Sequence, residues 1–125
     1  MSTAARSEPL LQITLLGEAV EHAPVGVFVF DERGEYVAVN LCGCELLGLD
    51  RDEILGSRIG TFAADREAAL RVYRDALAAG PADRITHVRR GDGSIVALRF
   101  RARETTIAGM TFYIGIAWPP DGSQA

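Results

Sequence analysis

The stretch that decides the fold consists of three consecutive segments, Val25-Gly-Val-Phe-Val-Phe30, Asp31-Glu-Arg-Gly34 and Glu35-Tyr-Val-Ala-Val39. The first segment is a β-branched and aromatic run, short enough to be a strand that is buried on both faces. The second is a turn in which Gly34 can adopt a positive φ. The third returns to a strand pattern, so the stretch predicts a β-hairpin.

The segment before this hairpin, residues 9–23, has the apolar spacing of an α-helix, and Pro24 ends it because proline cannot continue the helical hydrogen bonds. Its large apolar residues cover more than one narrow face of the helix. Such a helix requires either deep burial or two partners. We therefore expect a subunit interface on this helix, made by Leu10, Leu11, Ile13, Leu15, Leu16 and Val20.

Capping residues mark three further helices after the hairpin. Asn40 is a suitable N-cap for a short helix that Gly48 ends. The segment Asp50-Arg-Asp-Glu53 resembles a capping box and begins one more turn. Asp65 caps a longer helix that extends to Ala79.

The remainder of the chain is predicted to be β-strand, over Arg84–Arg90, Ile95–Arg103 and about Gly109–Trp118. The fold class is therefore α+β, an antiparallel sheet with short helices in the middle of the chain. The length of 125 residues fits one domain, at residues 9–118, with its helix at 9–23 and its core at 24–118. We expect flexible ends at residues 1–8 and 119–125.

Several short segments, in this order and at these separations, resemble the PAS domain family. They are Ala23–Asp31, Gly34–Asn40, Cys44-Glu-Leu-Leu-Gly48, Arg51-Asp-Glu-Ile-Leu-Gly56, Ala64-Asp-Arg-Glu67 and Arg89-Arg-Gly-Asp-Gly-Ser94. Each segment alone is a weak signal, since capped helices and Asp-Gly turns are common. The resemblance extends over roughly residues 10–118. It implies a five-stranded antiparallel sheet whose central helices close a small pocket over one face.

The resemblance also implies which side chains would meet a ligand in that pocket. These candidates are Phe28, Phe30, Leu70, Tyr73, Arg84, Thr86, Leu98, Phe100 and Tyr113. Tyr73, Tyr113 and Thr86 are the uncharged polar groups among them, and either they orient a ligand or they simply fill the space. The opposite face of the sheet would be apolar, with the N-terminal helix as its natural cover and room for a second subunit.

Two cofactors of PAS-like sensors are disfavoured by single positions. Haem would need a histidine on the helix Asp65–Ala79, where Ala69 stands at the corresponding place. A flavin photoadduct would need a cysteine shortly after Gly56, where Ile59 stands instead. The pair Cys42 and Cys44 lies on an earlier helix, and residues two apart on a helix point in different directions, so packing is their expected role.

Charge and composition exclude other classes of function. The formal net charge is −4, so we expect no nucleic acid partner. The row Arg99, Arg101 and Arg103 is expected to be solvated or paired with acids such as Glu18, Glu21 or Glu104. No apolar run is long enough to cross a membrane. Cys42 and Cys44 are too close in sequence to form a disulfide framework, so we expect a reducing, cytoplasmic compartment.

The sequence also offers no enzyme machinery. It contains no nucleophile with a base, no paired carboxylates and no phosphate-binding loop, so we expect no enzyme activity. An enzyme of the same general shape remains a third alternative, for which Tyr73 or Arg84 would be the first residues to test.

The favoured hypothesis is a bacterial-type sensor that acts as a homodimer. It would bind a small ligand and transmit the resulting structural change through the sheet and the N-terminal helix. The alternative is a ligand-free dimerisation or docking module. Trp118-Pro-Pro120 prevents the last strand from continuing into a helix, so the output would pass either to an effector protein or through an effector domain that is absent.

Overall fold

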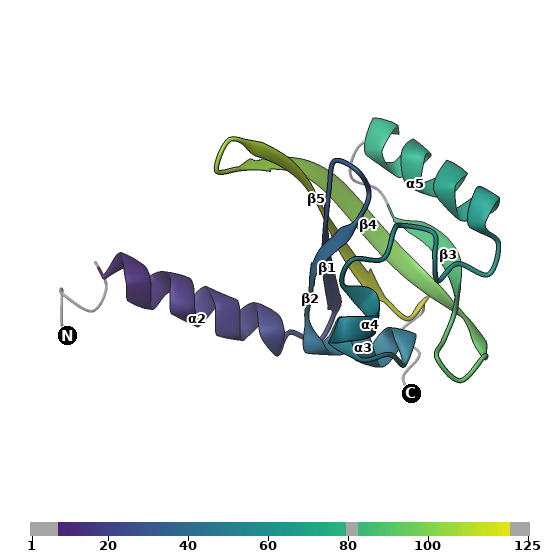
Figure 1. Ribbon diagram of the computed structural model, residues 1–125, viewed down its shortest axis with the longest axis horizontal. Helices are drawn as coiled ribbons and strands as arrows, with labels where there is room; N and C mark the ends of the chain where they lie inside the picture. Colours follow the sequence, from purple (N-terminus) through teal and green to yellow (C-terminus); the bar gives the residue numbers. More distant parts are fainter. Residues whose placement is uncertain (1–7, 80–82, 121–125) are drawn as a thin grey trace.

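The computed structural model describes residues 8–79 and 83–120. Five strands form one antiparallel sheet in the order β2-β1-β5-β4-β3. In chain order the elements are α2 (Pro9–Glu21), β1 (Gly26–Asp31), β2 (Tyr36–Val39), α3 (Leu41–Leu47), α4 (Arg51–Ile54), α5 (Arg66–Ala79), β3 (Arg84–Arg89), β4 (Ile95–Ile107) and β5 (Met110–Trp118). The predicted α+β class and five-stranded antiparallel sheet are therefore confirmed (Figure 1).

The hairpin that decides the fold contains a β-bulge. Phe28 pairs with Val39 and Val29 with Ala38, but Phe30 pairs with Tyr36, so Val37 is left out of the register. Because a bulge shifts the alternation of side chains, Tyr36 packs against the core whereas Val37 is 45% exposed. At the turn, Asp31 Oδ1 accepts from the backbone N–H groups of Arg33 and Glu35, and Gly34 has a φ of 81°.

The helix caps lie where the sequence predicts them. The side chain of Asn40 accepts a hydrogen bond from Gly43 N at the start of α3, and Gly48 ends that helix in the left-handed region. Asp65 immediately precedes α5, and its Oδ1 accepts from Ala68 N at 3.1 Å. Capping of this kind satisfies backbone N–H groups that have no partner within the helix.

The hairpin of β4 and β5 is longer than predicted. Pairing continues from Arg103 opposite Ile114 to Ile107 opposite Met110, and the turn places Ala108 at a φ of 53° and Gly109 at 78°. A two-residue turn with both residues at positive φ matches the right-handed twist of paired strands. The sequence predicted the end of β4 at Arg103 because the apolar alternation stops there, although the backbone pairing does not.

The core lies between the sheet and the central helices. The helix α5 packs against β3 and β4, and α3 packs against β1. Ile54 of α4 is fully buried, and Ala76 of α5 is 1% exposed. These helices lie on the opposite side of the sheet from α2 (Figure 1).

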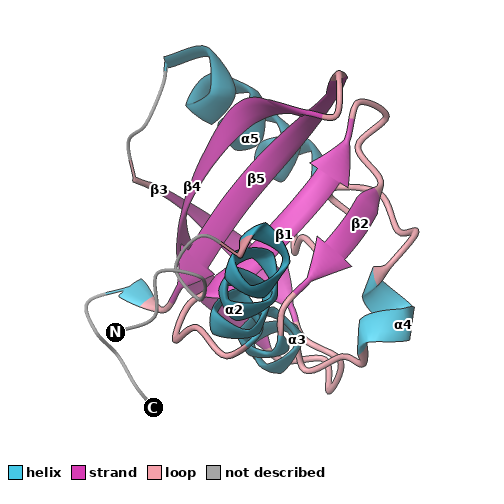
Figure 2. Cartoon of the chain, turned by 90° about the vertical axis from the view of Figure 1, so that its left-hand side faces the viewer, coloured by secondary structure: helices cyan, strands magenta, loops and turns pink. Residues whose placement is uncertain are grey.

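The N-terminal helix α2 lies on the predicted side of the sheet but not flat against it. It projects away from the sheet in Figure 1, and Figure 2 looks along its axis. None of its residues is buried, and its six large apolar side chains, Leu10, Leu11, Ile13, Leu15, Leu16 and Val20, are 40–71% exposed. Within one chain the helix therefore does not cover the outer face, because only its C-terminal end is attached to the core.

The outer face of the sheet is half-buried and mostly apolar. Its central residues are Val27, Val29, Phe112, Ile114 and Ile116. The predicted flexible segments fall largely on residues 1–7 and 121–125, which lie outside the described residues. Within the described part of the chain, no helix is both long and apolar enough to span a membrane.

Candidate functional site

A cavity of about 110 Å³, partly open to solvent, lies between the sheet and the central helices. Its sheet wall includes Phe28, Phe30, Thr86, Val88, Leu98 and Phe100. Its opposite wall includes Ile59, Gly60, Phe62, Ala63, Ala69 and Tyr73. No charged side chain of the described residues lines it, so its lining is mainly apolar and includes tyrosine and threonine residues.

Aromatic rings form one side of this cavity. The ring of Phe30 lies 5.0 Å from that of Tyr73, 5.7 Å from that of Tyr36 and 5.6 Å from that of Tyr113. The ring of Tyr73 also stacks on Phe100, with 6.1 Å between the ring centroids. These separations are within the range in which aromatic pairs attract one another.

The hydroxyl of Tyr73 is the exception within this well-packed cluster. It is buried and has no hydrogen-bond partner among the described residues. Burial raises the pKa of Tyr73 well above its ordinary value, and the neighbouring Tyr36 and Tyr113 add to the effect, so the phenol stays protonated. A buried hydroxyl without a partner lowers stability by about 1–3 kcal/mol.

Six of the nine ligand-contact candidates line the cavity: Phe28, Phe30, Tyr73, Thr86, Leu98 and Phe100. The other three do not. Tyr113 is on the inward face, opposite Phe30, but stacks on that ring outside the cavity. Leu70 is half-buried on α5 near Gly60, and Arg84 is half-buried at the start of β3, with its guanidinium donating to the carbonyl of Asp83.

Sequence reasoning missed the residues that tertiary structure brings to the cavity. Tyr36 is inward only because of the bulge in β2. The segment 59–63 reaches the cavity because it runs along the edge of β3, where Arg89 N donates to Phe62 O at 2.7 Å and Ala64 N donates to His87 O at 2.9 Å. No periodic pattern in the sequence signals such a non-helical wall.

The cavity wall lacks an iron-ligating histidine and an adduct-forming cysteine at the two positions named above. Ala69 and Ile59, the positions that disfavour these cofactors in the sequence, both lie in its wall, and neither side chain can ligate iron or form an adduct. His87 is exposed, and no cluster of metal-ligating side chains occurs in residues 8–79 and 83–120.

The two cysteines are free thiols on α3. Burial raises the pKa of both Cys42 and Cys44, which makes the reactive thiolate form scarcer. Cys44 packs against the core. This arrangement agrees with a packing role.

One buried polar side chain connects α2 to the core. Asn40 is 3% exposed and makes four hydrogen bonds. Its Oδ1 accepts from Val27 N at 2.8 Å and from Gly43 N at 2.9 Å, and its Nδ2 donates to Val20 O at 2.7 Å and to Val25 O at 3.0 Å. It therefore joins the last turn of α2, the start of β1 and the start of α3.

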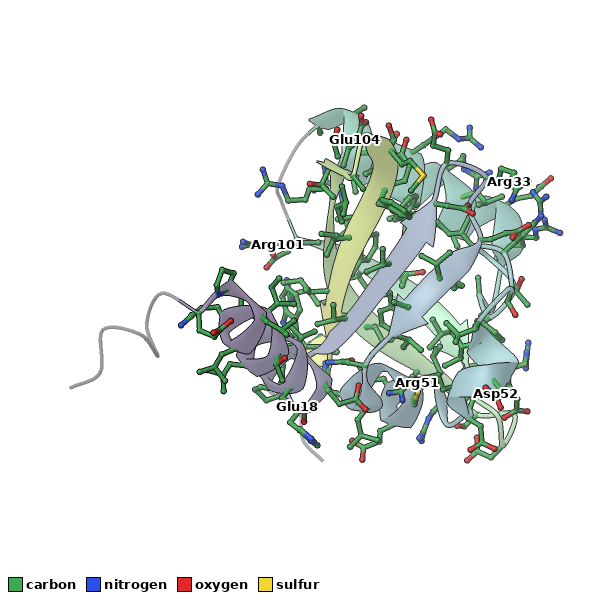
Figure 3. The ribbon with its side chains drawn as sticks, turned by 60° about the vertical axis from the view of Figure 1, so that its left-hand side comes forward. Glu18, Arg33, Arg51, Asp52, Arg101 and Glu104 are labelled. Carbon is green, nitrogen blue, oxygen red and sulfur yellow. The ribbon has the colours of Figure 1, made fainter. Side chains whose placement is uncertain are left out.

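A second link holds the same end of α2. The guanidinium of Arg51 donates to both carboxylate oxygens of Glu21, at 2.9 and 2.7 Å, and its Nε donates to Val39 O at 3.0 Å. Figure 3 shows Arg51 close to the junction of α2 with the rest of the domain. We call Asn40, Arg51 and Glu21 the α2 clamp.

The arginine row on β4 has a different partner from those expected. Arg101 Nε donates to Asp83 Oδ1 at 2.5 Å, and Arg99 Nη1 lies 3.8 Å from Asp83 Oδ2. The expectation of Glu18, Glu21 or Glu104 was wrong for these two residues, because the β3–β4 pairing brings the start of β3 beside them whereas Glu21 binds Arg51. Figure 3 shows Arg101 on the α2 side of the sheet.

Comparison with known proteins gives one family. The family model described as a PAS domain matches residues 14–81, which is more than half of the chain. No curated protein sequence matches.

Solved structures share the fold at low sequence identity. The PAS domain of an HTR-like protein from Haloarcula marismortui is 24% identical, with a TM-score of 0.73, covering 90% of this chain and 96% of that one. A domain of a sensory box sensor histidine kinase/response regulator from Geobacter sulfurreducens is 23% identical, with a TM-score of 0.71, covering 89% and 96%. An RNA-binding light-oxygen-voltage receptor is 23% identical, with a TM-score of 0.74, covering 95% of this chain and 36% of that one.

Proposed function

This chain belongs to the PAS domain family, and we propose that it is a sensory domain that binds a small ligand in its internal cavity and reports it through α2. The observation that carries the proposal is the cavity itself, whose lining is mainly apolar. Ligand sites are typically concave and apolar with a few polar groups, as here. We propose no catalytic activity, because the described wall holds no nucleophile with a base.

A continuous set of contacts supports the proposed relay. The ring of Phe28 lines the cavity and lies against Gly43, where an added Cβ would be 3.0 Å from the ring. Gly43 N is held by Asn40, which also binds the carbonyl of Val20 in α2. A ligand that displaces Phe28 therefore acts on the α2 clamp. A preference of about 1 kcal/mol for one position of α2 changes its population about fivefold.

We propose that the functional unit is a homodimer formed through α2. A helix of 13 residues is marginal in water on its own, and this one has six large apolar side chains exposed. The half-buried outer face of the sheet provides a further apolar surface beside it. Burial of about 800 Å² per subunit would suffice for a stable dimer.

The output partner would be an effector protein or an effector domain. The similar structures include domains of sensor histidine kinases, which are signalling proteins. We propose a cytoplasmic location, because both cysteines are free thiols and a reducing compartment keeps them so.

Native mass spectrometry of freshly purified, untagged protein tests ligand binding. We expect excess mass that is released as a small molecule on denaturation. Protein without excess mass at every purification step, still dimeric, would instead support a ligand-free dimerisation or docking module. The exposed apolar side chains of α2 are the observation that favours this alternative.

Sedimentation of matched variants tests the dimer. Leu16→Glu places a charge on α2, whereas Ile95→Glu places the same charge on a 52% exposed residue at the start of β4. We expect dimers for the wild type and Ile95→Glu, and monomers for Leu16→Glu, at concentrations of about 10 μM. A monomeric wild type, or equal behaviour of the two variants, contradicts an interface on α2.

A further inference from the structure

The strand β3 lies at one edge of the sheet, and a neighbouring segment covers only part of it. Residues 62–64 run antiparallel to its second half, where Arg89 N donates to Phe62 O at 2.7 Å. Ala64 N donates to His87 O at 2.9 Å. The chain then leaves this edge to form α5, which lies beside β3 (Figure 1). In the described part of the chain, no strand therefore covers the first half of β3.

Backbone groups in this uncovered half point away from the sheet. In an antiparallel ladder, successive residues direct their N–H and C=O groups alternately toward one neighbour and the other. His87 and Arg89 bind the segment 62–64, so Ile85, two residues before His87, faces the same way. Within residues 8–79 and 83–120, no backbone group pairs with the N–H or C=O of Ile85 or with the N–H of His87. An added strand would find two donors and one acceptor here.

A groove of about 280 Å³, partly open to solvent, lies between α5 and this edge. The side chains that line it from α5 and β3 are mostly small or apolar: Ala68, Ala69, Val72, Ile85, Thr86 and His87. Ile85 is 45% exposed, and Ile95, which also lines the groove, is 52% exposed. Edge strands of soluble proteins usually carry charged residues that prevent pairing, so an exposed isoleucine beside unpaired backbone indicates a binding site.

An extended peptide fits this edge better than a second copy of the chain does. In a second copy, residues 62–64 would occupy the edge of its own β3 at residues 87–89, so two β3 strands could pair only over about residues 84–86. A single strand avoids this obstruction, because it takes the position that the chain after residue 64 would have if it remained extended. It would then run antiparallel to β3, as residues 62–64 do.

The charge of the groove adds a requirement for the occupant. Asp65 lines the groove, and no lysine or arginine of the described residues does so. A strand that continues from the position of residues 62–64 would place its N-terminal end beside Asp65. A basic residue at that end would gain a charge-assisted contact with the carboxylate, whereas an acidic residue would be repelled.

We propose that the groove between α5 and β3 binds an extended segment of a partner protein, with apolar residues at alternate positions and a basic residue at its N-terminal end, which adds a strand to the sheet beside β3. Folded domains bind peptides in this way when main-chain hydrogen bonds give affinity and the alternate side chains give specificity. The inference does not depend on a ligand in the cavity or on a dimer through α2, so its failure would leave both of those proposals intact.

The probe is a short peptide, acetylated and amidated at its ends, of one lysine followed by alternating valine and threonine. Its control is the same peptide with every valine and threonine N-methylated, which keeps the side chains and the charge but removes the backbone donors. Titration into the isotope-labelled full chain, followed by amide chemical shifts, gives the affinity and the location. We expect the unmodified peptide to bind at least about 10-fold more tightly and to slow hydrogen exchange at the amides of Ile85 and His87.

Matched variants of the protein locate the site. Ile85→Lys and Val37→Lys place the same charge on the two edge strands, at residues that are both 45% exposed. We expect Ile85→Lys to weaken binding about 5-fold or more, and Val37→Lys to leave it unchanged. Ile85→Pro, which also removes the backbone N–H, should weaken binding still further, and proline is tolerated on edge strands.

Asp65→Asn tests the charge requirement. Asparagine retains the ability to cap α5, so the fold should be unaffected. The wild type should bind the lysine peptide about 2- to 5-fold more tightly than a peptide with glutamate in its place, and Asp65→Asn should lose this preference. Equal binding of the two peptides to the wild type would overturn the basic residue.

Other outcomes would overturn the site itself. These are equal affinity of the methylated and unmodified peptides, shifts centred away from β3 and α5, equal effects of Ile85→Lys and Val37→Lys, or no binding at about 1 mM peptide. A wild type that is dimeric in sedimentation while Ile85→Lys is monomeric would show that a second copy covers the edge, which would overturn the partner peptide.

Discussion

Replacement of Asn40 by alanine should destabilise the domain far more than the loss of an ordinary helix cap. The amide makes four hydrogen bonds, to Val27, Gly43, Val20 and Val25, and is 3% exposed. A hydrogen bond contributes about 0.5–1.5 kcal/mol net, and a buried group left without its partner costs about 1–3 kcal/mol. Four such losses give about 4 kcal/mol, a large part of the 5–15 kcal/mol that is typical of a domain.

Asp65→Ala is the matched control. Asp65 also caps a helix, but it makes a single exposed hydrogen bond to Ala68 N, so its loss should cost about 1 kcal/mol. Asn40→Ser provides an intermediate, because serine keeps the bond to Gly43 N and loses the others. Should the alanine variant prove too unstable to purify, the serine variant still separates the cap from the links to α2 and β1.

Urea denaturation followed by circular dichroism measures these differences. With a slope of about 2 kcal/mol per molar urea, Asn40→Ala should lower the midpoint by about 2 M and Asp65→Ala by about 0.5 M. Amide hydrogen exchange should show that Asn40→Ser also loses protection in the last turn of α2. Equal midpoints for Asn40→Ala and Asp65→Ala would refute the reasoning that Asn40 joins three elements.

Two further predictions concern glycine and tyrosine. Gly43→Ala should destabilise the domain by about 1–3 kcal/mol, because the added Cβ would lie 2.6 Å from Val39 Cγ2. Gly17→Ala, whose Cβ would have no atom within 4 Å, should instead stabilise α2 by about 0.5–1 kcal/mol. Thermal unfolding of both variants checks these opposite signs, and a stabilising Gly43→Ala would contradict the close packing of α3. Burial raises the pKa of Tyr36 to about 12 and that of Tyr73 further, above the value of about 10 expected in the unfolded chain, so the folded state retains two protons that the unfolded state releases. Stability should therefore fall by about 1.4 kcal/mol per pH unit for each of the two tyrosines from about pH 10 to 12. Urea midpoints across this range measure the slope, which Tyr36→Phe should reduce by about half, and an unchanged slope in that variant would exclude Tyr36 as a contributor.

The sequence alone contains most of the fold, because the relevant signals are local. The β-branched and aromatic run in Gly26–Asp31, the N-cap of Asn40, the N-cap of Asp65 and the turn glycine at Gly34 each specify a conformation through nearby backbone and side-chain groups. The resemblance to the PAS family implies which faces of the strands point inward, and six of the nine ligand-contact candidates that it implies lie in the cavity wall. The identities of Ala69 and Ile59, which argue against histidine-ligated haem and a flavin photoadduct, can be read from the sequence without the structure.

Tertiary structure alone decides what depends on register and on segments that are distant in the chain. The bulge that turns Tyr36 inward depends on how two strands pair, and alternation within one strand does not reveal it. The edge pairing of residues 62–64 with β3 brings Phe62 and Ala63 to the cavity. Likewise, the pairing of β3 with β4, rather than the charge pattern, makes Asp83 the partner of Arg99 and Arg101.

The same distinction applies to two buried polar side chains, those of Asn40 and Tyr73. The sequence identifies Asn40 as a cap, but only the folded chain brings the carbonyls of Val20 and Val25 to its amide nitrogen. The sequence places Tyr73 on the inner face of a helix, but only the packing of Phe30 and Phe100 against its ring leaves the hydroxyl buried without a partner. Local chemistry fixes which elements form, whereas the satisfaction of a buried polar group depends on every element packed around it.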